Sequence, residues 1–168
     1  MLPKIIKDCI LSIEGRGYAG IVDNIEWPKL TRKMEEFRAG GMFGPVEIDL
    51  GMDKMEISFE APEQTREAIR LFGVCGAGGI KLRLNASAES ELDCSSYGIE
   101  VVMSGRIREI DFGSRKNGDL QKTKYTVSLA TFHYSIDGRT LFDIDFLNNI
   151  FLIDGRDVLE KRRRNLKM

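Results

Sequence analysis

Residues 27–51 read W-P-K-L-T-R-K-M-E-E-F-R-A-G-G-M-F-G-P-V-E-I-D-L-G, which is two strand-like segments joined by a loop. Met42 and Phe43 lie at the tip of this loop, between Gly40-Gly41 and Gly44-Pro45. Glycine and proline favour turns, so two large apolar side chains are placed where the chain should be most exposed. This placement predicts a surface that contacts a partner. The residues expected at this contact are Arg38, Met42, Phe43, Pro45 and Glu47.

Length and composition predict one globular domain over residues 1–168. The chain is 42% hydrophobic and 30% charged, and its length lies within the about 100–200 residues typical of a single domain. A formal net charge of −1 gives no overall positive field to hold nucleic acid. We see neither a signal peptide nor the run of about 18 apolar residues that spans a membrane. We therefore expect a protein made in a cytoplasm, with no membrane partner.

The three cysteines, Cys9, Cys75 and Cys94, are far apart and form no C-x-x-C pair. This spacing argues against a disulfide framework and against a zinc site. We expect them to be reduced and partly buried, and we expect the protein to need no metal or cofactor.

Alternating apolar and polar residues predict a mainly β protein. Residues 55–59 and 80–84 show the clearest alternation, which gives each strand one apolar face. Weaker alternation predicts strands at 9–13, 19–27, 99–110, 125–136 and 139–147. Gly15-Arg16-Gly17 is expected to join the first two of these as a hairpin. The expected fold is an antiparallel β-sandwich or barrel.

Two helices and a bulge complete the expected fold. Pro62–Phe72 carries apolar residues at helical spacing and is followed by Gly73, so one helix is expected beside the sheet. A short helix from Asp157 is expected to end the chain. The apolar parity changes within 125–136, which a bulge near Ala130 explains; such a bulge lets a strand bend from one sheet into another.

Two groups resemble catalytic or metal-binding residues. Asp143 and Asp145 share one face of a predicted strand, an arrangement that suits a divalent cation or acid–base chemistry. His133 is the single histidine and has no recognisable nucleophile motif beside it. We interpret the carboxylates as a solvated face and the histidine as a structural strand residue, and we expect no enzyme activity.

Several motifs resemble the major tail tube protein family of contractile-tailed bacteriophages, and tail-derived bacteriocin tubes are similar. They are P-K-L-T-R-K at 28–33, V-E-I-D-L-G at 46–51, G-I-E-V-V-M-S-G-R-I-R-E-I-D-F-G at 98–113, D-G-R-T-L-F-D-I-D at 137–145 and D-G-R-D-V-L-E-K-R-R-R-N-L at 154–166. The motifs occur in the family's order along nearly the whole chain, which is more specific than any one of them.

The resemblance implies a structural subunit whose hexameric rings stack into a tail tube that conducts DNA. Its implied partners are other copies of itself and the tail sheath, tape measure, baseplate and tail terminator proteins. The implied location is the virion tail, assembled in the host bacterial cytoplasm. The tip residues named above would then form the inter-ring interface, Asp143 and Asp145 would form an acidic face toward the lumen or solvent, and the long strands at 98–112 and 122–136 would supply the edges that close the ring.

A small β-barrel that binds single-stranded nucleic acid is the alternative. It requires aromatic and basic side chains interleaved on one exposed face, and Lys122, Lys124, Phe132 and Tyr134 are the candidates. A hydrolase is less favoured because no nucleophile–histidine pair or metal cluster is apparent.

Overall fold

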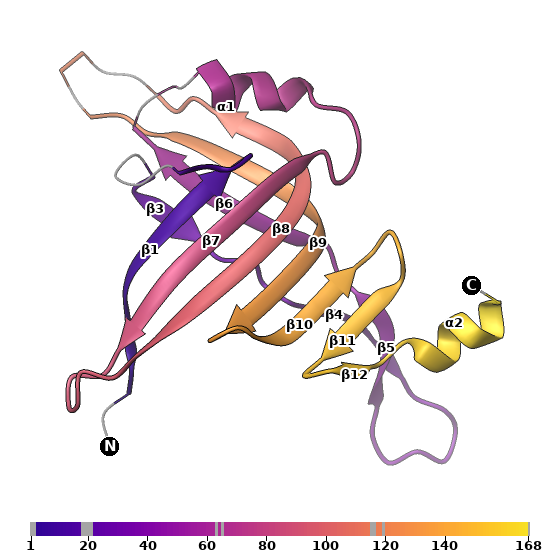
Figure 1. Cartoon of the computed structure of the whole chain (residues 1–168). Helices are drawn as coiled ribbons and strands as arrows, with labels where there is room; N and C mark the ends of the chain where they lie inside the picture. Colours follow the sequence, from indigo (N-terminus) through magenta and orange to yellow (C-terminus); the bar gives the residue numbers. More distant parts are fainter. Residues whose placement is uncertain are drawn as a thin grey trace.

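The computed structural model describes residues 3–17, 22–62, 64, 66–114, 117, 118 and 120–167. Most of this chain is β-strand (Figure 1). The elements are β1 (Ile5–Ile13), β2 (Arg16–Gly17), β3 (Asn24–Glu26), β4 (Arg32–Phe37), β5 (Val46–Met52), β6 (Met55–Ala61), α1 (Arg66–Arg70), the 3₁₀ turn η1 (Leu71–Gly73), β7 (Ile80–Glu89), β8 (Ser96–Asp111), β9 (Thr123–Ile136), β10 (Arg139–Asp145), β11 (Ile150–Ile153), β12 (Arg156–Asp157) and α2 (Glu160–Leu166).

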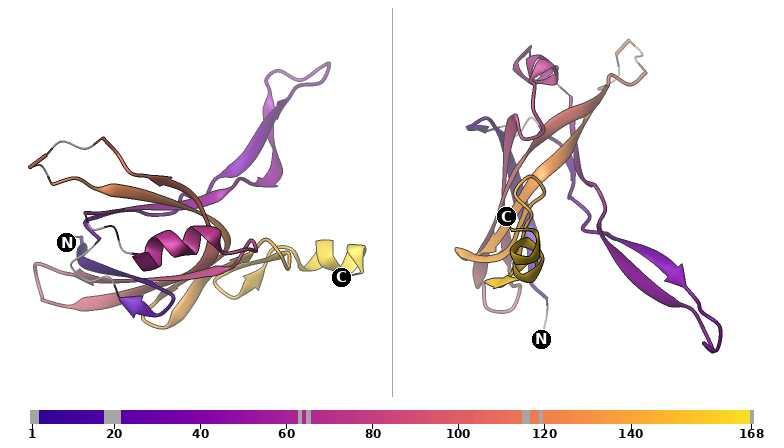
Figure 2. Two further views of the ribbon diagram at one scale, coloured as in Figure 1. Left: turned by 90° about the horizontal axis from the view of Figure 1, so that it is seen from above. Right: turned by 90° about the vertical axis from the view of Figure 1, so that its right-hand side faces the viewer.

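Ten strands form one antiparallel sheet with the order β12-β11-β10-β9-β8-β7-β1-β2, and β6 and β3 extend it from β9. The sheet curves, and α1 lies across one end of it (Figures 1 and 2). The remaining strands, β4 and β5, pair only with each other and stand away from the sheet. The predicted antiparallel β fold, with one helix beside it and a short helix at the C-terminus, is confirmed.

The core lies on the concave side of the curved sheet, where alternate residues of β6 to β9 are buried. The two segments with the clearest alternation, 55–59 and 80–84, place their apolar side chains in this core. Ala68 of α1 closes one end of it. Because this alternation gives each strand one apolar and one polar face, it already specified which side of each strand turns inward.

β9 belongs to two parts of the sheet, and Ala130 marks the change. Up to Leu129 the strand pairs with β6, and from Thr131 onward it pairs with β10. On the opposite side, Gly105 of β8 faces Leu129 and Ser104 faces Thr131, which leaves Ala130 as the extra residue of a bulge. The predicted bulge is therefore confirmed, and it is the point at which the C-terminal strands branch from the curved sheet.

Several expected boundaries were wrong. β2 contains two residues, and β3 pairs with β6 rather than completing a hairpin with β1; Ala19 and Ile21 lie outside the described residues. The first helix begins at Arg66 rather than near Pro62, and α2 begins at Glu160 because Asp157 pairs in β12.

The three cysteines differ in burial. Cys75 and Cys94 are exposed, and only Cys9 is partly buried.

The long strands supply only part of the free edge that we expected. β9 is hydrogen-bonded on both sides along most of its length, and β8 is paired on both sides from Ile99 to Gly105. From Arg106 to Asp111, β8 pairs only with β9 among the described residues, which leaves this part of the strand with an open edge. Among the described residues, β1 has a neighbour on its outer side only at Ser12 and Ile13.

Candidate functional site

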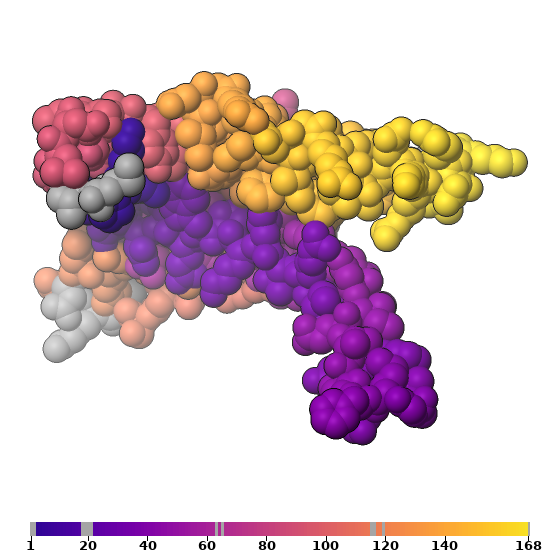
Figure 3. All heavy atoms as spheres, turned by 90° about the horizontal axis from the view of Figure 1, so that it is seen from below, coloured from indigo at the N-terminus to yellow at the C-terminus, as the bar shows by residue number. Residues whose placement is uncertain are grey.

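The most prominent surface feature is the pair β4 and β5 with the turn that joins them, residues 32–52, which we call the arm. It projects away from the sheet (Figures 2 and 3). All six residues of β4 and the first five of β5 are exposed. An isolated two-stranded hairpin is only marginally stable in water, so an arm of this kind is typical of a segment that acquires neighbours in an assembly.

One face of the arm is apolar. Phe37 lies opposite Val46, and Glu35 lies opposite Ile48, so these side chains share a face. Because side chains alternate between the two faces of a strand, Leu50 lies on the same face as Val46 and Ile48. Phe37, Val46, Ile48 and Leu50 are 44–52% exposed, which leaves a row of apolar side chains without cover.

The opposite face of the arm is acidic. Glu36 lies directly opposite Glu47, and among the described residues neither carboxylate takes part in an ion pair. Two like charges at directly opposed positions destabilise a strand pair. The repulsion is relieved when a cation from another chain comes near.

The tip of the arm presents Phe43 to solvent. The N–H of Met42 donates to the carbonyl of Ala39 at 3.2 Å, and the N–H of Ala39 donates to the Met42 sulfur at 3.1 Å. Gly41 has φ +84°, which favours glycine in this turn. Met42 is thereby folded against the turn and partly buried, whereas Phe43 is fully exposed at 105%.

The other tip residues expected at the contact surround Phe43. Arg38 and Pro45 are exposed beside the turn, and Glu47 is exposed on the acidic face of β5. Of the expected set, Met42 alone makes a contact within its own subunit that covers part of its side chain.

The base of the arm approaches the C-terminal part of the chain without closing against it. Arg32 forms an ion pair with Asp49 across the hairpin, and its guanidinium lies 6.0 Å from the centre of the Phe151 ring. The N–H of Gly51 donates to Asp49 at 2.8 Å. This hydrogen bond, with the charges of Arg32 and Arg162, holds the pKa of the Asp49 carboxyl below its usual range, so the carboxylate stays ionised at neutral pH.

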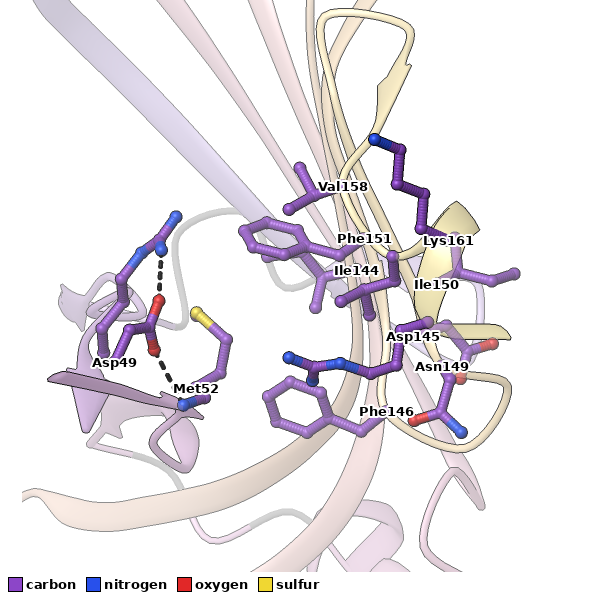
Figure 4. A pocket seen from close by; sticks show the side chains of 14 residues that line it. Asp49, Met52, Ile144, Asp145, Phe146, Asn149, Ile150, Phe151, Val158 and Lys161 are labelled. Atoms are coloured by element: carbon purple, nitrogen blue, oxygen red, sulfur yellow. Dashed lines mark hydrogen bonds and ion pairs between the residues drawn. The ribbon is translucent and has the colours of Figure 1, made fainter. Parts of the chain in front are cut away.

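Between the arm's base and the C-terminal segment lies a groove of about 510 Å³ (Figures 3 and 4). Its floor and far wall are largely apolar and come from β10, β11 and the approach to α2. Its lining residues are Arg32, Asp49, Gly51, Met52, Ile144, Asp145, Phe146, Asn149, Ile150, Phe151, Val158, Leu159, Lys161 and Arg162. Phe146 and Val158 remain 38% and 45% exposed, so the groove is open and unfilled by its own chain.

The cations near the C-terminus divide into two groups. Arg163 pairs with Asp157 and donates to the carbonyl of Asn149 at 2.8 Å, and Arg164 pairs with Glu160 at 2.8 Å. The contacts of Arg163 hold α2 to β12 and to the residue before β11, whereas the pair of Arg164 lies within α2. Lys161 and Arg162, by contrast, lie on the groove rim and take part in no ion pair within the described part of the chain.

Asp143 and Asp145 do not form a joint carboxylate site. Asp143 lies directly opposite His133, with 3.7 Å between Oδ1 and Nδ1. Asp145 accepts the N–H groups of Leu147 and Asn148 at 2.8 and 3.0 Å, which closes the turn after β10. Each carboxylate therefore has its own local role.

His133 also lies 3.3 Å from the hydroxyl of Thr140, between Nε2 and Oγ1. This contact and the one to Asp143 join neighbouring antiparallel strands, where polar cross-strand pairs are ordinary. Among the described residues, no three His, Cys, Asp or Glu side chains are grouped closely enough to hold a metal ion. The part of the chain that is described also contains no helix long and apolar enough to cross a membrane.

Sequence reasoning found the tip but missed the groove. The groove needs β11 and the apolar residues around it, and the run I-F-L-I at 150–153 was not assigned to a strand. A continuous apolar run of four residues flanked by turns is a signal for a short strand. Its position against the arm depends on tertiary structure.

Comparison with known proteins gives a consistent result. The family model described as phage tail tube protein FII matches residues 3–166. The chain is 33% identical to the tail tube protein of Escherichia phage P2, covering 98% of both chains. It is 34% identical to the major tail tube protein of Serratia phage KSP20, covering 96% of this chain and 94% of that one.

A solved structure shares the fold. A chain of the sheath–tube complex of an extracellular contractile injection system, PVC, in its extended state superposes with a TM-score of 0.57. The identity is 11%, and the match covers 79% of this chain and 91% of that chain.

Proposed function

Because this chain belongs to the phage tail tube protein FII family, we propose that it is the subunit of the inner tube of a contractile tail, forming hexameric rings that stack into a conduit for DNA. The observation from the chain itself that carries this proposal is the arm. An exposed hairpin with an apolar face, an uncompensated acidic face and a bare aromatic tip is suited to subunit contacts and has little use in a monomer.

The arm is proposed to make the contact between successive rings, through Arg38, Met42, Phe43, Pro45 and Glu47. Burial of a large apolar side chain contributes about 1.5–3 kcal/mol, and Phe43 has nearly all of its surface available. Each ring would repeat the contact several times, so a modest energy per subunit suffices to hold a stack.

Ring closure is proposed to use the free edge of β1. Its outer side lacks a strand neighbour before Ser12 among the described residues, and Ile5, Ile6 and Ile10 are 40–50% exposed. Joining this edge to the far edge of a neighbour's sheet, formed by β3 and β6, would satisfy unpaired backbone groups on both subunits.

The proposed partners beyond the chain itself are the tail sheath, tape measure, baseplate and terminator proteins. The proposed location is the virion tail, assembled in the host bacterial cytoplasm. DNA would pass through the lumen without specific binding, which agrees with the net charge of −1. Asp143 and Asp145 stay candidates for an acidic surface toward the lumen or solvent.

The role is proposed to be structural, with no chemical step and no cofactor. We therefore expect His133→Ala, and Asp143→Asn combined with Asp145→Asn, to remove no turnover reaction. A reaction that either variant abolished would contradict the structural role.

The residues named for single-stranded nucleic-acid binding do not form a stacking platform. Phe132 is 4% exposed in the core, where no base can reach it. Lys124 pairs with Glu26 at 3.0 Å, and Lys122 pairs with Asp23. Tyr134 is partly buried against the core, so these residues offer no fully exposed ring beside a free charge, as such binding requires.

Electron microscopy of the purified protein, without added metal or cofactor, tests the proposal. We expect rings or tubes in negative stain. A monodisperse monomer that persists at high concentration, with no ring in any image, would contradict it. A labelled oligonucleotide that binds the monomer in a salt-dependent way would favour the nucleic-acid alternative instead.

A further inference from the structure

We propose that the groove beside the arm's base is the socket for the arm tip of a second copy of this chain in the next ring, with Phe43 as the inserted side chain. This inference rests on the proposed function and adds the receiving surface of the contact. Its first support is that the tip and the groove are each incomplete. Phe43 has no cover in its own subunit, and Phe146 and Val158 line a groove that the same chain leaves open.

The size of the groove suits this occupant. At about 510 Å³, it lies within the about 300–1,000 Å³ of pockets that enclose a ligand. A phenyl ring with adjoining turn atoms fits such a volume. The aromatic rings of Phe146 and Phe151 and the side chain of Ile150 offer the apolar contacts that an inserted aromatic side chain requires (Figure 4).

Charge complementarity identifies the arm as the occupant. Glu36 and Glu47 oppose each other on the arm without a cation. Lys161 and Arg162 stand on the groove rim without an ion pair among the described residues, although the groove also holds Asp49, whose pKa the charge of Arg162 helps to lower, and Asp145. Docking brings these two sets together, which relieves the repulsion on the arm and supplies partners for the rim cations.

The two surfaces must belong to different copies. The groove is at the base of the arm and Phe43 is at the opposite end of strands six and seven residues long. At about 3.3 Å per residue, the strands separate tip and base by about 20 Å. A protrusion and a complementary socket at different places on one subunit produce a head-to-tail contact, which either closes into a ring or continues as an open stack, and the proposal assigns it to the stack.

Site-specific cross-linking tests the socket. Cys75 and Cys94 are exposed, so the experiment uses a Cys75→Ser, Cys94→Ser background in which tube formation is first verified. One preparation carries Gly44→Cys, a change that keeps Phe43 and meets no atom within 4 Å, and a second carries Val158→Cys; the two are mixed before assembly and mildly oxidised. We expect a disulfide-linked dimer from the mixture and none from either preparation alone. Leu92→Cys, at a residue 64% exposed in the loop between β7 and β8, replaces Val158→Cys in the control and should give no dimer.

A chain that carries both Gly44→Cys and Val158→Cys distinguishes the direction of the contact. Disulfide-linked species larger than a hexamer would support a contact between rings. If the largest linked species were a hexamer, the contact would lie within one ring and the assignment would be overturned. Normal tubes without any link between the two positions would refute the socket while leaving the tube function intact. If the unsubstituted chain formed no rings or tubes, the proposed function would fail, and the socket with it.

Reversing the charges gives an independent readout. Arg162→Glu should shorten or abolish tubes, and Glu47→Arg in the same chain should restore their length. Arg139→Glu is the matched control, because Arg139 is exposed and pairs with Asp154 away from the groove. Failure of Glu47→Arg to restore tubes that Arg162→Glu has lost would contradict the pairing of arm and rim.

Discussion

The guanidinium of Arg32 lies 6.0 Å from the centre of the Phe151 ring, and this contact connects the base of the arm to the C-terminal strands. A cation–π contact at an exposed site contributes about 0.5–1 kcal/mol. Arg32 also pairs with Asp49 of the opposite strand. One side chain therefore joins the two strands of the arm and also contacts β11.

We expect Arg32→Ala to loosen the arm with little effect on the fold, because the side chain lies outside the core. In a Met42→Ser, Phe43→Ser background that does not stack, trypsin should cleave the arm at Lys33 and Arg38 several-fold faster, while the melting temperature changes little. Arg139→Ala, which breaks an exposed ion pair elsewhere, should leave the cleavage rate of the arm unchanged. Equal rates in the Arg32→Ala and parent proteins would show that this contact does not hold the arm.

The tip is expected to act in assembly and not in folding. Met42→Ser with Phe43→Ser should keep the free energy of unfolding within about 0.5 kcal/mol, as is usual for surface changes, and should shorten or abolish tubes. Circular dichroism melts and electron micrographs measure the two effects. Leu120→Ser, at an apolar residue 81% exposed away from the arm, serves as the control. If the double variant formed tubes of normal length, the tip would have no role in stacking. A large fall in its melting temperature would instead assign the tip to the core.

Because of the bulge at Ala130, we expect a small substitution on the facing strand, β8, to lower the stability of the protein strongly. A Cβ on Gly105 would lie 2.3 Å from the carbonyl oxygen of Ser128, so Gly105→Ala must displace backbone. We expect a loss of about 1–3 kcal/mol in the free energy of unfolding, measured by urea denaturation. Gly98→Ala in the same strand meets no atom within 4 Å and should cost far less. Equal stabilities of the two variants would show that the backbone at the bulge adapts without strain.

The attachment of α2 is expected to depend on pH. The hydrogen bond from Arg163 holds the pKa of Asp157 below its ordinary value in the folded protein. A lowered folded pKa means that the contribution to stability is present above the unfolded pKa of about 3.9 and is lost as the pH falls through the folded value. The Cα chemical shifts of Glu160–Leu166 should thus move toward coil values below about pH 4.

Asp157→Asn should give the same shift changes in α2 already at neutral pH, because it removes the carboxylate that Arg163 holds. Asp154→Asn, which removes the exposed partner of Arg139, provides the control and should leave α2 unchanged. Helical shifts that persist in Asp157→Asn would show that other contacts hold α2.

The local pattern of the sequence determined the strands and one bend. Side-chain alternation has a period of two in any strand, so Met55 and Leu84 could be assigned to the core without knowing their neighbours. The change of parity in β9 located the bulge at Ala130, because an extra residue reverses the faces on either side of it. Glycine and proline around Met42 and Phe43 likewise marked the tip of the arm.

Tertiary structure decided which surfaces those elements form. Strand order depends on contacts between distant residues, and for that reason β9, which we expected at an edge, proved to be central, while β1 and the end of β8 kept open edges in the described part of the chain. The groove joins Met52 at the base of the arm to Phe151 and Val158, which follow it by about a hundred residues. No local sequence pattern indicates that these residues are neighbours. They come together only because the sheet branches at Ala130, which brings β10 and β11 beside the arm.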